Sequence, residues 1–98
     1  MALIDDYDFH LLKNEAEQLV LRELELQLEA ADPQMCRCDE CVLDMATMAL
    51  NAVKPLYRFS LLGSQYAAQA MNEQAYADSV QQAVSQAMDR VSSNPAHD

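Results

Sequence analysis

Three cysteines lie close together in the segment CRCDEC, at positions 36, 38 and 41, and the chain contains no other cysteine. Thiolates at this C-x-C-x-x-C spacing can reach a common point, and sulfur donors suit a soft ion with tetrahedral coordination, zinc above all. An odd number of clustered cysteines is a poor framework for disulfides and is typical of a reducing compartment. Cys36, Cys38 and Cys41 are therefore predicted to bind a structural zinc ion, and the alternative is a loop of free thiols.

A tetrahedral zinc site needs a fourth ligand, which the cysteine spacing does not identify. With water in the fourth position the site would resemble a catalytic one. However, no H-x-E, H-E-x-x-H or similar acid–base partner lies near the cysteines in the sequence. No catalytic triad, P-loop or paired-carboxylate site is recognisable either, so we do not expect an enzyme. The candidates for the fourth ligand are His10, His97, Asp39, Asp44, a water molecule, or a group from a second subunit.

Length and composition predict one small all-α domain. The chain has 98 residues, with one glycine, three prolines and no tryptophan, so it lacks the turn residues that a many-stranded sheet needs. Its commonest residues favour helices. The predicted core covers about residues 9–92, followed by a short tail at 93–98. No apolar run approaches the length that spans a bilayer, and the N-terminus carries acids where a signal peptide has bases. A cytoplasmic protein without a membrane span is expected.

The pattern of apolar residues predicts two long helices and a central one. The first should begin near Asp6 or Asp8 and run to about Ala30, where Asp32-Pro33 ends it. Its apolar stripe includes Leu12, and further leucines outside the stripe hint at dimerisation. The central helix is predicted from about residue 39 to 53, with Cys41 in its first turn, and the last long helix from about 73 to 92.

Between the central and the last helix, prolines and a glycine interrupt the helical pattern. Pro55 stops the central helix, and the segment PLYRFSLLG is predicted to be an irregular or extended link in which a short strand would fit. Gly63 is the residue that can take a positive φ at little cost. A short helix is expected after this glycine, in the segment SQYAAQAM.

The charge of the chain is strongly uneven. Residues 1–44 hold 12 acidic and 3 basic residues, whereas residues 45–98 hold 4 acidic and 3 basic ones. Duplex DNA is a poor partner for such a chain, because phosphate binding needs a basic face. Residues 45–72 contain no acid, and Lys54 and Arg58 lie in this window beside Tyr57 and Tyr66. Cations that bind phosphate and rings that stack on bases favour a nucleotide site here.

The alternative for these residues is a structural one. In that interpretation the aromatic side chains Tyr57, Phe59 and Tyr66 pack in the core. Arg58 would then pair with a carboxylate of the acidic first helix. The residues alone favour this alternative, and they leave both interpretations open.

A series of short motifs follows in order along the chain. The motifs are N-x-x-E-x-x-V (Asn14, Glu17, Val20), CxCxxC, D-x-x-x-x-A-L-N (Asp44, Ala49, Leu50, Asn51), P-x-Y (Pro55, Tyr57), G-x-x-Y (Gly63, Tyr66) and the final N-P-A-H. Their order and spacing over about residues 14–97 resemble the ComFB family of late competence development proteins. Two departures stand out, because relatives have a fourth cysteine and read P-R-H where this chain has Pro95-Ala96-His97.

This resemblance implies a small, mostly helical bacterial protein that forms an intertwined homodimer, holds zinc at the cysteines and is not an enzyme. Cyanobacterial members resemble receptors for cyclic di-GMP, which would make the Lys54, Tyr57, Arg58 and Tyr66 set a cyclic dinucleotide site. The leading hypothesis is thus a regulator that binds cyclic di-GMP and relays it to a partner protein. The alternative is a zinc-stapled interaction module with no nucleotide ligand, and a zinc hydrolase with an open fourth position is the third hypothesis.

Overall fold

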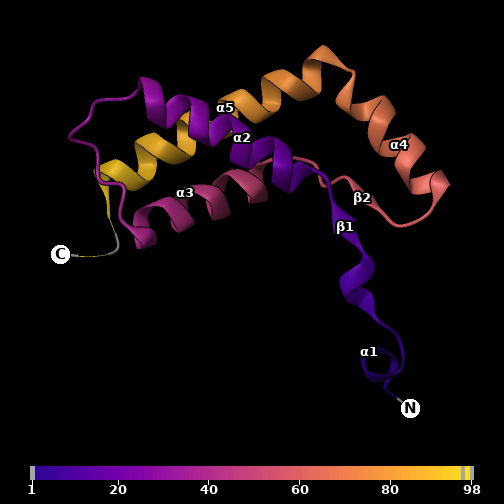
Figure 1. The fold of residues 1–98 in the computed structure, drawn as a ribbon. Coiled ribbons are helices and arrows are strands. Elements are labelled where there is room, and N and C mark those ends of the chain that lie inside the picture. The colour runs from indigo at the N-terminus through magenta and orange to yellow at the C-terminus, as the bar shows by residue number, and fades with distance from the viewer. Residues whose placement is uncertain (1, 96, 98) are drawn as a thin grey trace.

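The computed structural model describes residues 2–95 and 97, and this part of the chain is mainly helical, as the sequence predicts. Figure 1 shows a helical body from which a short N-terminal arm and a further helix extend. The elements in chain order are α1 (Leu3–Asp6), the 3-10 helix η1 (Phe9–Leu11), β1 (Lys13–Asn14), α2 (Ala16–Ala30), α3 (Asp39–Ala52), β2 (Tyr57–Arg58), α4 (Leu61–Met71) and α5 (Gln74–Ser93).

The core lies between α2, α3 and α5. Helix α3 packs along α5, and α2 lies against both. The apolar faces predicted for the central and last helices are confirmed, since Met45, Ala49, Val80 and Val84 are all buried. Burial of these apolar faces stabilises the helices, because isolated helices of this length are only marginally stable in water. None of the helices in the described part of the chain is long and apolar enough to cross a membrane.

The first long helix begins later than the sequence predicts. Helix α2 starts at Ala16, and Leu12 is exposed instead of belonging to its apolar stripe. Asp8 accepts a hydrogen bond from the backbone N–H of His10 and so caps η1, a different and shorter helix. The reason is tertiary, because residues 13–14 pair with β2 as a small antiparallel ribbon in which Lys13 faces Arg58.

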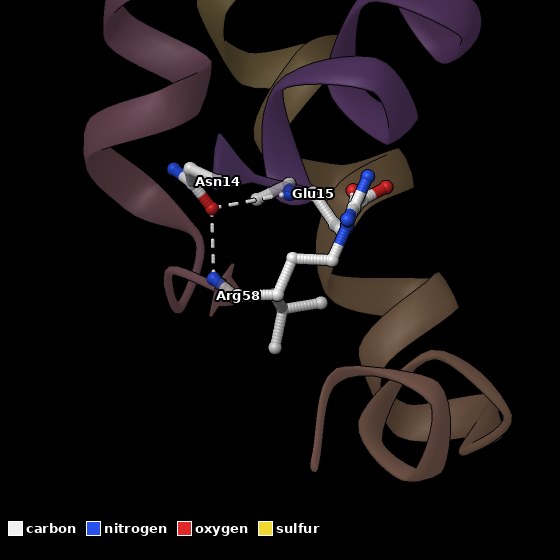
Figure 2. A network of polar contacts seen from close by, with 5 residues as sticks. Asn14, Glu15 and Arg58 are labelled. Carbon is white, nitrogen blue, oxygen red and sulfur yellow. Dashed lines mark hydrogen bonds and ion pairs between the residues drawn. The ribbon is translucent and has the colours of Figure 1, made fainter. Parts of the chain in front are cut away.

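Asn14 connects this ribbon to the start of α2. Its side-chain Oδ1 accepts from the backbone N–H of Leu56 at 2.8 Å and from that of Ala16 at 3.1 Å. The backbone N–H of Glu15 donates to Leu56 O at 2.8 Å and extends the pairing by one residue. Figure 2 shows Asn14, Glu15 and Arg58 gathered at this junction. An asparagine that satisfies two amides in this way fixes where the helix can begin.

The predicted link with a short strand is confirmed by β2, but the role expected for Gly63 is wrong. No described glycine has a positive φ, and Gly63 lies within the first turn of α4. A Cβ atom at this position would lie 3.1 Å from the Cα of Arg58 and 3.5 Å from the carbonyl oxygen of Tyr57. Glycine is used here because α4 passes very close to the backbone of β2, and not because of its backbone freedom.

Candidate metal centre

The three cysteines and His97 meet at one end of the helical body. Cys36 and Cys38 lie in the loop between α2 and α3, and Cys41 lies in the first turn of α3. The Nε2 atom of His97 is 3.0 Å from the Sγ of Cys41 and 3.4 Å from the Sγ of Cys36. The four ligand atoms all lie within 4.8 Å of one another. The structure therefore brings together the three cysteines predicted as ligands and adds a histidine.

The order of the helices explains this meeting point. Helices α2 and α5 run in the same direction and α3 runs back against both, so the end of α2, the start of α3 and the end of α5 lie on one side of the molecule (Figure 1). The cysteine loop joins the first two of these ends, and the tail with His97 follows the third. Residues far apart in the sequence thus reach one point because the three packed helices have these ends on the same side of the molecule.

The donor set fits zinc. A tetrahedral ion with Zn–S bonds of about 2.3 Å and Zn–N bonds of about 2.0 Å has donors spaced roughly 3.5–3.8 Å apart. The cluster spans a similar range, from 3.0 Å for the Cys41–His97 pair to an upper limit of 4.8 Å. Three sulfur atoms and one imidazole nitrogen form one of the usual structural zinc sets. The cluster can therefore hold a metal ion such as zinc.

His97 supplies the fourth donor among the described residues. His10 lies in η1, on the N-terminal arm at the other end of the molecule (Figure 1). Asp39 and Asp44 lie on α3 but are not part of the cluster of four donors. The final N-P-A-H, where relatives read P-R-H, was the signal in the sequence that could have singled out His97. Residue 96, where the chain departs from its relatives, lies outside the described residues.

Burial distinguishes the three thiols. Cys41 is buried, whereas Cys36 and Cys38 are exposed. Burial, with the neighbouring thiols Cys36 and Cys38, raises the pKa of Cys41 to about 12. The pKa of Cys36 is lowered, first by a hydrogen bond from the backbone of Cys38 and then by the side chains of Cys38 and Cys41. A protonated Cys41 must lose its proton when its sulfur binds a metal, so binding releases protons.

The residues predicted for nucleotide binding do not form one cluster. Lys54 lies over the ring of Tyr66, with its Nζ 5.8 Å from the ring centroid. Hydrogen bonding to the Tyr66 side chain is the main cause of the raised pKa of Lys54. Arg58 forms an ion pair with Glu15 at the start of α2 (Figure 2). Tyr57 instead lines a polar hollow beside β1. The structure thus joins Lys54 to Tyr66 and gives Arg58 a carboxylate partner.

The structural alternative for this set is confirmed for Arg58 and wrong for the aromatic residues. The ion pair with Glu15 is the kind of partner that this alternative predicts. Tyr57, Phe59 and Tyr66, however, are 58%, 65% and 51% exposed, so they are not core residues. Rings exposed to this degree are available to a ligand or to another protein surface.

Comparison with known proteins identifies the family. The family model described as "Late competence development protein ComFB" matches residues 13–95. The chain belongs to the ComFB family. Its fold is also similar to a solved structure from Bacillus subtilis, titled "Structural characterization of the late competence protein ComFB from Bacillus subtilis". That similarity has a TM-score of 0.68 at 21% sequence identity and covers 87% of this chain and 92% of the other. No curated protein sequence matches the chain.

Membership of the ComFB family confirms the resemblance that the motifs indicate. At this level of identity the solved structure supports the shared fold and nothing finer. The family match includes all three cysteines and ends two residues before His97. Sequence reasoning also missed Glu15, whose role depends on the pairing of β1 with β2.

Proposed function

We propose that this chain is a non-enzymatic regulatory protein of the ComFB family, stapled by one zinc ion. The cluster of Cys36, Cys38, Cys41 and His97 carries this proposal, since it offers four protein donors within 4.8 Å. Structural zinc sites are closed by four protein ligands, whereas catalytic sites keep one position open for water or substrate. The zinc would tie the tail after α5 to the loop between α2 and α3. A hydrolase needs the open position that His97 would fill.

Metal analysis tests this proposal directly. The purified protein should contain one zinc ion per chain, and cobalt substitution should give the visible spectrum of a tetrahedral site with three thiolates. His97→Ala should weaken the binding of zinc and open one position to water. A protein that binds no zinc, or whose site is unaffected by His97→Ala, would contradict the proposed staple.

The proposed ligand is cyclic di-GMP, and the proposed contacts to it come from Lys54, Tyr57, Arg58 and Tyr66, in the segment from the end of α3 to α4. Three features support it. Residues 45–72 contain no acid. Tyr57 and Tyr66 are exposed and can stack on bases, and Lys54 and Arg58 can contact phosphate. Ligand binding would favour one arrangement of the protein over another and so relay the signal to a partner protein. The free energy of this shift can be no larger than the difference between the ligand's binding free energies for the two arrangements.

Calorimetric titration should show that the zinc-loaded protein binds cyclic di-GMP with micromolar or tighter affinity, about −8 kcal/mol, and binds cyclic di-AMP and GTP more weakly. Lys54→Ala and Arg58→Ala should each reduce this affinity, since each removes a phosphate contact. Arg90→Ala, on α5, is the matched control and should leave it unchanged. No heat with cyclic di-GMP would leave the zinc-stapled interaction module as the function, and an unaffected Arg58→Ala would remove that residue from the site.

We further propose that the protein is a homodimer whose second copy covers the N-terminal arm and the start of α4. The arm and Phe59 enclose an apolar hollow of about 490 Å³. Leu61 and Leu62, which begin α4, are 75% and 78% exposed. The radius of gyration of 15.7 Å exceeds the roughly 13 Å of a compact domain of this length. Apolar surface of this extent on an extended arm is typical of a subunit interface.

Leu62→Glu should shift the protein toward the monomer, because a carboxylate placed in an apolar interface loses its hydration without a partner. Analytical ultracentrifugation across a range of concentrations would measure this shift. Gln82→Glu adds the same charge on the exposed side of α5 and serves as the control. A wild-type protein that is monomeric at high concentration would contradict the proposed dimer.

A further inference from the structure

Arg37, the residue between Cys36 and Cys38, is the centre of a dense set of hydrogen bonds. Its side chain is exposed, yet both terminal nitrogens of its guanidinium, Nη1 and Nη2, donate to backbone carbonyls around it. A planar group with several N–H donors is well suited to bridge carbonyls that point in different directions. It donates to the carbonyl oxygens of Leu28 at 2.6 Å, Met35 at 2.9 Å, Asp32 at 3.2 Å and Pro33 at 3.3 Å.

These four carbonyls belong to two structures that meet at the loop. Leu28 lies in the last turn of α2, where a positive charge is favourable, and its carbonyl also accepts from the backbone N–H of Ala31 at 3.3 Å. The other three belong to the turn that follows, which the side chain of Asp32 also supports by accepting from the N–H of Gln34 at 2.9 Å. Arg37 therefore joins the end of α2 to the turn that leads into the cysteines.

Packing against the core does not by itself hold the two exposed cysteines in place. The core contact just before them is made by Met35, whereas Cys36 and Cys38 are exposed. The loop has no disulfide to define its path, and Pro33 fixes the backbone only at the turn before Met35. An exposed loop without such a restraint samples many conformations, and ordering it opposes the binding of a metal.

We propose that Arg37 is a positioning residue for the metal centre. By holding the turn against the end of α2, it keeps the backbone on both sides of itself in the conformation that directs the sulfurs of Cys36 and Cys38 toward Cys41 and His97. This inference rests on the proposed zinc site. It adds a residue that touches neither the metal nor its ligand atoms and yet determines how tightly zinc is bound.

The test compares the zinc affinity of the full-length wild type, Arg37→Ala and Arg37→Lys by competition with a chromophoric chelator. Arg37→Ala should weaken binding by about 10-fold to 100-fold, the range seen when groups that orient metal ligands are removed. Arg37→Lys keeps the charge but not the planar fork of donors, so it should bind zinc nearly as weakly. Arg22→Ala, at an exposed position of α2, is the control and should match the wild type.

Two further readouts separate positioning from a general loss of structure. The cobalt spectrum of Arg37→Ala should keep the form of a site with three thiolates and one imidazole, and its unfolding in chelator should match that of Arg22→Ala. Wild-type zinc affinity in Arg37→Ala or Arg37→Lys, with the wild type itself binding zinc, would overturn the role of Arg37 alone. A wild type that binds no zinc would overturn the zinc proposal and this inference with it.

Discussion

Cys41→Ser is expected to abolish tight zinc binding and to remove the stability that zinc confers. Cys41 is the buried member of the cluster, and it presents its sulfur from the first turn of α3. When free zinc is about 1,000 times its dissociation constant, binding to the folded state adds about 4 kcal/mol to the free energy of unfolding. Losing this term should lower the midpoint of thermal unfolding by roughly 15 °C or more for a chain of this size.

Thermal unfolding with and without a chelator measures this effect. The chelator should destabilise the wild type and leave Cys41→Ser unchanged. Cys38→Ser is the matched variant at an exposed cysteine, and in chelator it should unfold like the wild type, because no core contact is lost. Cys41→Ser should remain less stable than Cys38→Ser in chelator, since it buries a hydroxyl in place of a thiol. Equal stability of the wild type with and without chelator would contradict a structural zinc.

Asn14→Ala is expected to lower the free energy of unfolding by about 2–3 kcal/mol. The alanine would leave two partly buried backbone N–H groups, those of Ala16 and Leu56, without the acceptor that Asn14 provides. Each amide deprived of its partner costs about 1–3 kcal/mol. One bond joins Asn14 to Leu56, which is 42 positions away along the chain, and the other joins Asn14 to Ala16 in the first turn of α2 (Figure 2). Their loss should loosen the ribbon and the start of the helix together.

Chemical denaturation of the zinc-loaded protein would measure this change. Asn14→Asp keeps an oxygen acceptor at the same place and adds a favourable negative charge near the start of α2, so it should retain most of the stability. Asn51→Ala, at an exposed position of α3, is the control and should change stability by less than about 0.5 kcal/mol. If Asn14→Ala were as stable as Asn51→Ala, the two hydrogen bonds would have no structural role.

Local patterns were sufficient for much of the helical body. The extent of α3 and α5 and their buried faces follow from the periodicity of apolar residues. These two helices pack along each other, so the side that the sequence makes apolar is the side that the fold buries. The end of α2 likewise follows from Asp32-Pro33, because proline cannot continue a helix.

The start of α2 could not be predicted in the same way. Residues before Ala16 have helical propensity and an apolar residue at the expected spacing, but their backbone pairs with β2 instead. The same ribbon determines that Arg58 meets Glu15 and that Gly63 must lack a side chain. Each of these contacts joins segments that are far apart in the sequence or depends on how closely two backbones approach.

Residue types and their spacing within a few turns are enough to predict the all-α class, the two long helices with a central one, and the suitability of Cys36, Cys38 and Cys41 as metal ligands. Which of several candidate ligands joins the cysteines depends instead on how the helices pack. His97 reaches Cys41 across 56 residues of sequence, and it does so because α5 ends beside the start of α3. Spacing along the chain carries no information about such a distance, whereas the packing of one helix against another fixes it.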